Sequence, residues 1–349
     1  MAGISDNRPK ALIVSMNFNP GHISHLIASY KQMTELGYES ICYVNPAFKD
    51  FMPEEIAFIS SDNKVPDCDV AIMTFPSLHN INLIRKLRSH KAKIIYIFHE
   101  PLALFSEYRK AGFSYKYLAK LWIIDHINSL TVKWSDYILI PSKKALEYYN
   151  KNPKYKNPNV QYIPLLYDDE AIGMASCKRQ YISYIGTVAA DHSFDEFLEF
   201  IEKAIDSNWN PDYIYLIATK SEFEVPKKLA ESPRVVIKKG SPLTNNEINQ
   251  AYASSVLVWN AYDRTTQSGV LAKAYMFGTP ALVMKHNLNE FMIDRQTVYS
   301  IGDNKDTNEI QHGVEDIILN FDKYKKNSRD LFLTRFYYRN YNKILKGLL

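Results

Sequence analysis

Residues 265–284 read Thr-Thr-Gln-Ser-Gly-Val-Leu-Ala-Lys-Ala-Tyr-Met-Phe-Gly-Thr-Pro-Ala-Leu-Val-Met, and this stretch decides the fold. The apolar runs at 255–260, just before it, and at 280–284 have the length and β-branching of buried strands. Between them, residues 269–277 place apolar side chains on one helical face, and Gly278 is positioned to end the helix. Strand, polar loop, helix and strand together predict a right-handed crossover in a parallel sheet.

The polar loop 265–268 of this unit is expected at the carboxyl edge of the sheet, against a helix N-terminus. Free backbone N–H groups and the helix dipole make that place suit an anion, most often a phosphate. Ser268 would add a hydroxyl donor, and Gly269 would let the backbone approach closely. An ordinary helix N-cap without a ligand explains the same residues equally well.

Length and composition limit the class of protein. A chain of 349 residues suits two domains, and a hydrophobic content of 46% is enough for two cores. The net charge of +4 is too small to indicate a nucleic-acid partner. Three scattered cysteines without metal-ligand spacing favour a reducing, cytosolic setting, and neither a signal peptide nor an apolar membrane span is expected.

Apolar runs alternate with helical patterns along the chain, which is typical of open parallel sheets covered on both faces. The predicted strands are 11–15, 38–44, 70–75, 94–98, 137–140 and 160–164 in the first half, and 181–186, 213–217, 235–237, 256–260 and 281–284 in the second. Two helices are predicted within 315–349, and the stretch 165–178 without periodicity is interpreted as a linker. We therefore predict an α/β protein of two Rossmann-like doubly wound domains that face each other across a cleft.

The motifs resemble those of GT-B glycosyltransferases, in particular glycosyltransferase family 4. The second half carries the resemblance through the segments 181–187 and 246–253, Gly240 and, above all, 268–283. The first half is similar more loosely, at 20–26, 98–101, 140–142 and 160–164. The resemblance implies an acceptor domain at 1–165, a nucleotide-sugar domain at 179–326, and a final helix within 327–349 that crosses back to the first domain.

The resemblance also implies a donor site in the second half. It carries over to Gly186, Thr187, Lys220, Thr266, Gln267, Ser268, Gly269, Val270 and Lys273. The family usually has a pair of Glu residues here, where this sequence has Thr265 and Lys273. The segment 189–192 stands where the family's cationic clamp on the diphosphate usually lies, so Lys273 and Lys220 are our candidates for the missing cation.

Glu100 is the candidate base of the first half, because it follows the predicted strand 94–98 at the edge where such sheets bind ligands. Its neighbour His99 could contact the sugar or the phosphate. The alternative is that Pro101 opens a helix and Glu100 merely stands at its start.

The loop after the first strand is the candidate acceptor site. Gly21 would let an acceptor come close to the backbone, and His22 and His25 flank the same loop. A surface position without a role explains either histidine equally well.

Two further segments allow two interpretations each. Residues 108–134 mix basic and aromatic side chains, which could lie on a membrane surface that carries lipid-linked acceptors, although we favour a core helix with a solvated lysine face. Asp168, Asp169 and Glu170 could suggest a metal, but without a second carboxylate cluster we interpret them as a solvated linker.

The sequence therefore predicts a hexosyl-type glycosyltransferase that moves a sugar from a UDP- or GDP-linked donor to a glycan or lipid-linked saccharide. The expected setting is bacterial surface polysaccharide synthesis (capsule, O-antigen or lipopolysaccharide), in the cytoplasm or peripherally on the inner face of the membrane. Neither a cofactor nor a metal is expected. A sugar-nucleotide epimerase of the same architecture and a non-catalytic nucleotide-sugar-binding subunit are the alternatives.

Overall fold

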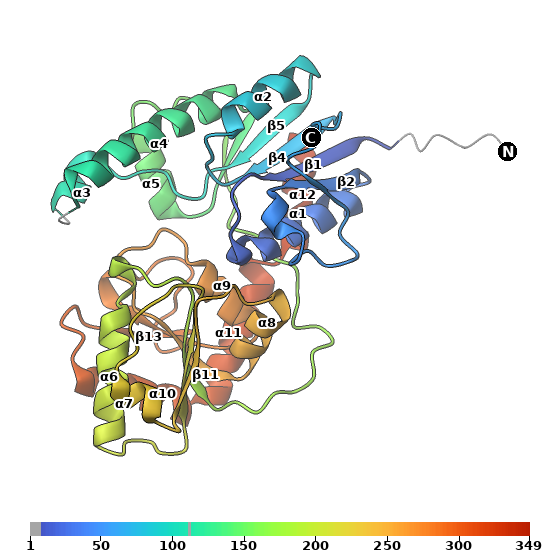
Figure 1. Ribbon diagram of the computed structural model, residues 1–349. Coiled ribbons are helices and arrows are strands. Elements are labelled where there is room, and N and C mark those ends of the chain that lie inside the picture. The colour runs from blue at the N-terminus through green and yellow to red at the C-terminus, as the bar shows by residue number, and fades with distance from the viewer. Residues whose placement is uncertain (1–7, 111–112) are drawn as a thin grey trace. The chain divides into compact units, whose positions relative to one another are not determined.

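The computed structural model describes residues 8–110 and 113–349. The chain forms two compact units, one built from residues 1–168 together with 337–349, and the other from Asp169–Phe336. Each unit has one parallel sheet with helices on both of its faces (Figure 1). The predicted fold class, two Rossmann-like α/β domains, is confirmed.

The sheet of the first unit has the strand order β3-β2-β1-β4-β5-β6-β7. Its strands are β1 (Lys10–Ser15), β2 (Glu39–Val44), β3 (Phe58–Ser60), β4 (Val70–Thr74), β5 (Lys93–Ile97), β6 (Tyr137–Ile140) and β7 (Val160–Tyr162). Its helices are α1 (Ile23–Glu35), α2 (Asn80–Ser89), α3 (Phe105–Lys110), α4 (Tyr115–Trp134), α5 (Lys143–Lys151) and α12 (Asn342–Leu348). The cores show that α1 and α12 cover one face of the sheet while α2, α4 and α5 cover the other (Figure 1).

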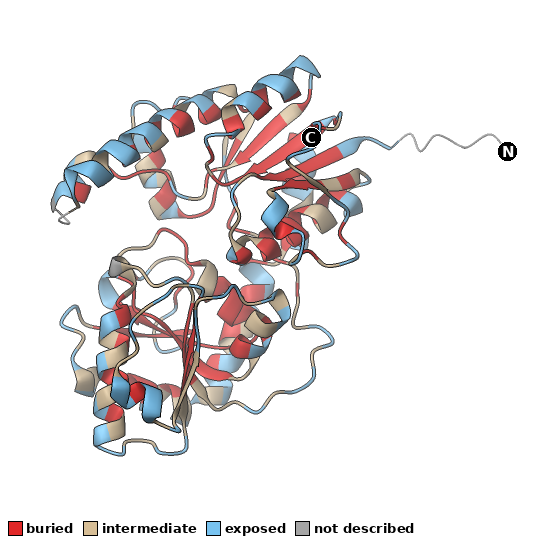
Figure 2. Cartoon of the chain, in the orientation of Figure 1, coloured by how far each residue is buried: buried red, intermediate tan, exposed pale blue. Residues whose placement is uncertain are grey.

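The sheet of the second unit has the order β10-β9-β8-β11-β12-β13. Its strands are β8 (Tyr181–Ile185), β9 (Ile214–Ala218), β10 (Val235–Lys238), β11 (Ser255–Asn260), β12 (Ala281–Met284) and β13 (Val298–Ile301). Its helices are α6 (Phe194–Asp206), α7 (Lys227–Glu231), α8 (Asn245–Ala253), α9 (Gly269–Met276), α10 (Thr307–Leu319) and α11 (Phe321–Arg335). Strands β11 and β12 are buried along their whole length, because the sheet is covered on both faces (Figure 2).

The strand order decides where ligands can bind. In each sheet the chain reverses its direction of winding once, between β1 and β4 in the first unit and between β8 and β11 in the second. Ligands of open parallel sheets bind at such a switch point, outside the carboxyl ends of the strands. The loops that leave β1 and β4, and those that leave β8 and β11, are therefore the places to look for function.

Three details differ from the sequence expectations. Strands β3 and β13 were not predicted, and the helices of the C-terminal part begin earlier, with α10 at Thr307. The chain returns to the first unit at Tyr337, after α11, and not at residue 327. A backbone hydrogen bond holds the returning segment in the first unit, since the N–H of Tyr338 donates to the carbonyl oxygen of Tyr167 at 3.1 Å.

Candidate functional site

The edge of the second sheet is assembled around Gly186, which directly follows β8. Its φ of +143° lies in a region that side chains rarely adopt. A Cβ atom there would stand 3.4 Å from Cγ2 of Val270 and 3.6 Å from the hydroxyl of Tyr262. A Cβ atom would therefore fit, and it is the backbone conformation of the turn before Thr187 that favours glycine here. The structure brings together the predicted residues Gly186, Thr187 and Val270.

The start of α9 is held by Ser268, whose Oγ accepts from the N–H of Leu271 at 3.3 Å. Nδ2 of Asn260, the last residue of β11, donates to the same oxygen at 2.9 Å. The predicted N-cap is therefore present. Strand end and helix start are joined by a buried hydrogen bond, which makes the loop between them a rigid one.

Thr266 and Gln267 lie in that loop and are each only 3% exposed. Among residues 8–110 and 113–349, the hydroxyl of Thr266 finds no hydrogen-bond partner. A buried hydroxyl without a partner is costly, so such a group usually meets a ligand or water oxygen. Together with its place at the N-terminus of α9, where the helix dipole favours negative charge, this hydroxyl gives the loop the chemistry of an anion site.

The side chain of Lys273 is engaged by residues of the second unit. Its Nζ is 2.8 Å from Oε2 of Glu170 and 3.2 Å from Oδ1 of Asn245, and its side chain is only 6% exposed. Burial lowers the pKa of Lys273, and the Glu170 carboxylate opposes that shift. Its charge is thus already compensated within the second unit, and a contact with a donor stays a prediction.

Lys220 is the other candidate cation. It is exposed and follows β9, the strand next to β8, at the same edge of the sheet. Although the residue as a whole is exposed, partial burial of its ammonium group lowers the pKa of Lys220. Its neighbour Ser221 accepts from the N–H of Val188 at 3.1 Å, which ties this loop to the turn after Gly186.

Sequence reasoning missed His192 and Tyr262 at this edge. Their rings are stacked, with centroids 4.0 Å apart and planes at 8°. Nδ1 of His192 donates to the carbonyl oxygen of Thr187 at 2.7 Å, so the histidine fixes the turn that follows Gly186. The only available signal was position, since Tyr262 comes two residues after a buried strand and His192 stands in the segment where a cationic clamp was expected.

At the edge of the first sheet, the predicted residues His22, His25 and His99 surround Phe75, which sequence reasoning did not single out. The ring of Phe75, the residue after β4, stacks on His22 with centroids 3.4 Å apart and planes at 9°. The His99 ring meets it edge-on at 5.6 Å, and the His25 ring lies at 6.0 Å. Gly21 belongs to the short 3-10 turn that precedes α1, beside His22.

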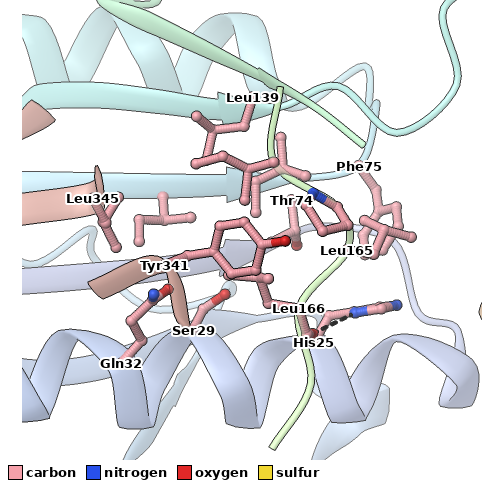
Figure 3. Close-up of a pocket in the computed structure, with 14 residues that line it drawn as sticks. His25, Ser29, Gln32, Thr74, Phe75, Leu139, Leu165, Leu166, Tyr341 and Leu345 are labelled. Atoms are coloured by element: carbon pink, nitrogen blue, oxygen red, sulfur yellow. Dashed lines mark hydrogen bonds between the residues drawn. The ribbon is translucent and has the colours of Figure 1, made fainter. Parts of the chain in front are cut away.

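His25 also lines a small, mostly apolar pocket of the first unit (Figure 3). Its Nδ1 donates to the carbonyl oxygen of Leu166 at 3.0 Å, and its ring lies 4.4 Å from that of Tyr167. Figure 3 shows this hydrogen bond and places Phe75 and Thr74 at the same side of the pocket. His25 is therefore a buried, positioned histidine and not a surface one.

Glu100 is exposed beyond the end of β5. Residues 98–104 are not helical, and α3 begins only at Phe105. The alternative that Pro101 opens a helix with Glu100 at its start is therefore wrong, because no helix begins before Phe105. Glu100 as a base stays a prediction.

The acidic linker is not solvated, which corrects the sequence interpretation. Asp168 pairs with Lys31 at 2.6 Å, Asp169 with Arg329, and Glu170 with Lys273 at 2.8 Å. Each carboxylate has a cation because the elements that flank the linker present basic side chains to it. In the described part of the chain, no group of three or more His, Cys, Asp or Glu residues could hold a metal ion.

Helix α4 packs on the first sheet and exposes Lys116, Lys120 and Lys133, but its buried and exposed sides both mix polar and apolar residues. Its buried residues include Asp125 and Asn128, whereas Trp122 and Ile123 are 53% and 51% exposed. Asp125 is satisfied by Lys154 at 2.6 Å and by the hydroxyl of Tyr155 at 2.8 Å, so its carboxylate can be buried. No helix in residues 8–110 and 113–349 is long and apolar enough to cross a membrane.

Comparisons with known proteins place this fold. No family model matches the sequence, and no curated protein matches it. Sucrose-phosphate synthase from Thermosynechococcus elongatus superposes with a TM-score of 0.69 at 10% identity, with 98% of each chain covered. Anabaena HepE, solved with UDP and glucose, gives 0.68 at 11% identity over 97% of this chain and 98% of that one. A putative UDP-N-acetylglucosamine 2-epimerase from Listeria monocytogenes gives 0.58 at 13% identity over 92% and 91%. The two doubly wound units of this chain thus have the GT-B fold that these structures share.

Proposed function

We propose that this protein is a glycosyltransferase that moves a sugar from a UDP- or GDP-linked donor to a glycan or lipid-linked saccharide. The observation that carries the proposal is the buried hydroxyl of Thr266 without a partner in the described chain, beside the N-terminus of α9 at the switch point of the second sheet. HepE, which has the same fold, was solved with UDP and glucose. The expected setting remains bacterial surface polysaccharide synthesis.

In this proposal the second unit holds the donor. The diphosphate lies against the N–H groups of α9, with hydroxyl donors from Thr187, Thr266 and Ser268 and a cation from Lys220. These groups stabilise the charge that develops on the diphosphate as the sugar leaves, which fixed dipoles can do without a metal. The remaining predicted contacts are Gly186, Gln267, Gly269, Val270 and Lys273.

The first unit holds the acceptor in the same proposal. Gly21, His22 and His25 line its approach, Glu100 accepts a proton from the attacking hydroxyl, and His99 contacts the transferred sugar or its phosphate. Support comes from the position of Gly21, His22 and His25 after β1, at the switch point of the first sheet. His99 and Glu100 follow β5, the strand next to β4, and the rings of His22 and His99 contact one common ring.

The first test is a thermal-shift screen against UDP, GDP, CMP and dTDP. A ligand that binds only the native state raises the melting temperature, by an amount equivalent to about 2.7 kcal/mol at a hundredfold excess over Kd. We expect stabilisation by UDP or GDP in the native protein and its loss in Ser268→Ala. The matched control is Ser114→Ala, which removes the N-cap of α4 in the first unit and should leave the nucleotide shift intact.

Failure of all four nucleotides to stabilise well-folded protein would refute the donor site. Stabilisation that Ser268→Ala leaves unchanged would place the nucleotide elsewhere in the protein. Incubation with the matching nucleotide sugars then separates the chemical alternatives. An epimerase, which the Listeria neighbour keeps in consideration, converts the free sugar nucleotide without an acceptor. A binding subunit without catalysis releases no free nucleotide at all.

We further propose that the protein contacts the cytoplasmic face of the membrane through the outer face of α4. Trp122, Ile123 and Tyr115 are at least half exposed there, with Lys116 and Lys120 exposed beside them. Aromatic side chains flanked by lysines suit an anionic lipid interface. Co-sedimentation with vesicles that contain 30% anionic lipid tests this, at ~0.15 M salt. Trp122→Ser with Ile123→Ser should abolish sedimentation, whereas the exposed Leu319→Ser of the second unit should not.

A further inference from the structure

The backbone of Phe75 adopts a conformation that a bulky side chain avoids. Its φ is +65°, and its side chain is buried, with 6% exposed. The other non-glycine residues with positive φ among the described residues are Lys91, Ser193, Asn208, Asn210, Arg295 and Lys305. Those are polar residues of turns, several of a type that tolerates the left-handed region. Phe75 differs from them because it is bulky, apolar and buried, so its left-handed backbone needs a structural explanation.

The neighbouring hydrogen bonds show how this conformation is held. The hydroxyl of Thr74 donates to the carbonyl oxygen of Val14 at 2.7 Å, which ties the end of β4 to β1. Nδ2 of the buried Asn80 donates to the carbonyl oxygen of Phe75 itself at 3.0 Å. The residue is thus fixed on both sides, and its ring is turned back over the sheet edge where α1 begins.

The consequence of that turn is the contact with the histidines. The ring stacks face to face on His22, from the loop before α1, and is in a T-shaped arrangement with His99, from the loop after β5. Two loops that are far apart in the sequence therefore share one rigid aromatic support. The left-handed backbone is what brings the ring there, since a residue with an extended backbone would continue the direction of β4.

We propose that Phe75 is a positioning residue, which sets the imidazole planes of His22 and His99 for the reaction at the edge of the first sheet. The inference rests on the proposed sugar transfer. In it Phe75 acts through the two histidines and does not itself touch the reacting atoms. Rigid placement matters because a displacement of about 1 Å at a reacting group can lower a rate by about a hundredfold.

The test compares Phe75→Leu, Phe75→Tyr and Phe75→Gly in the full-length protein. Leucine keeps the apolar volume and the backbone strain but removes the planar ring, whereas glycine removes the ring and accepts φ of +65° without strain. We expect kcat to fall by about 10–100-fold in both, with the donor KM changed less than about twofold. Tyrosine keeps the ring and should restore kcat. Lys91→Gly is the control, because it relieves the same kind of φ at an exposed turn and should leave kcat unchanged.

A multiple-mutant comparison tests whether Phe75 acts through the two histidines. If it does, Phe75→Leu added to a protein that carries both His22→Gln and His99→Gln lowers kcat by less than about threefold further, because residues that act as a unit are not additive. A full multiplicative loss would overturn the proposal. So would a Phe75→Leu protein with normal kcat.

Nuclear magnetic resonance of the imidazole protons tests the positioning role of Phe75 independently of the proposed sugar transfer. A histidine stacked at 3.4 Å on an aromatic ring has its protons displaced by the ring current, and the displacement should disappear in Phe75→Leu but not in Lys91→Gly. His22 resonances that stay in place in Phe75→Leu refute the positioning role even in a protein without transferase activity. Wild-type protein that binds no nucleotide refutes the sugar transfer, whatever the histidine resonances show.

Discussion

The ion pair between Lys273 and Glu170 gives the sharpest test of how the second unit is built. The two side chains are only 6% and 10% exposed, with Nζ and Oε2 2.8 Å apart. Lys273→Met removes the cation and leaves a buried carboxylate with the amide donors of Asn245, at 2.5 Å, and Asn249, at 2.9 Å. Breaking a buried pair from one side costs about 3–5 kcal/mol, and the two remaining amides place the expected loss near the lower end, at about 3 kcal/mol.

The assay is urea unfolding followed by the fluorescence of Trp259, which is buried in the core of the second unit. A loss of about 3 kcal/mol corresponds to a melting temperature lower by about 6–12 °C for a domain of this size. Replacing both residues, as Lys273→Met with Glu170→Leu, should cost less than either single change, because no charge is then left buried. The exposed pair of Lys326 and Asp330 supplies the control, since Lys326→Met should cost at most about 0.5 kcal/mol.

Two results would refute this reasoning. Single changes at Lys273 and Glu170 that each cost under about 1 kcal/mol and add in the double variant would mean that the pair is solvated and uncoupled. A Lys273→Met protein of normal stability that has lost its nucleotide-induced thermal shift would mean that the lysine serves the donor instead. The second outcome would reinstate Lys273 as the missing cation at the diphosphate.

Two further predictions concern the same unit. Burial acts to lower the pKa of His286, but its hydrogen bonds to the Asp263 carbonyl and the Asp303 carboxylate raise it above the ordinary 6.5. Because the pKa of His286 is higher in the folded protein, the protonated histidine stabilises the fold below pH 6.5, and this contribution is lost as the pH rises through the folded-state pKa. The urea midpoint should therefore fall between pH 6 and pH 8.5. His286→Gln should flatten this pH dependence, whereas the exposed His312→Gln should not. Gly278→Ala places a Cβ 2.9 Å from Cγ and 3.0 Å from the carbonyl oxygen of Lys325 at a φ of +65°, so we expect a loss of about 2–4 kcal/mol in urea unfolding. Gly37→Ala, which also follows a helix at positive φ but meets nothing within 4 Å, should lose only about 1 kcal/mol, and equal losses in the two variants would contradict the steric argument.

Four of the strands that sequence reasoning found share a property that β3, one of the two missed strands, lacks. β1, β4, β11 and β12 are runs of apolar residues long enough to be buried on both faces, so their pattern is visible without a structure. β3 has three residues, none of them buried, at the edge of its sheet. The N-cap Ser268 was visible too, since capping depends on residues close together in the sequence.

The missed parts of the site depend on long-range partners or on rare backbone conformations. Glu170 and Lys273 are 103 residues apart, so the sequence could not reveal that a linker acid neutralises a helix lysine. Phe75 appeared as the end of a strand because its left-handed φ has no signature in the sequence. The burial of Asp125 on α4 was hidden for the first of these reasons, since its partners Asn152, Lys154 and Tyr155 lie 27 to 30 residues further along the chain.

The composition of the first unit has a consequence for the way the protein is made. Its core includes Leu345 and Leu348 from the last helix, and Gln32 and Glu35 of α1 bond to Tyr338, Arg339 and Asn342. A ribosome delivers residues in order, so the first domain to be synthesised waits for the final segment while the whole second domain emerges. In that interval the apolar face beside α1 has no cover. A nascent chain of this protein should therefore depend on chaperones for its first domain more than for its second.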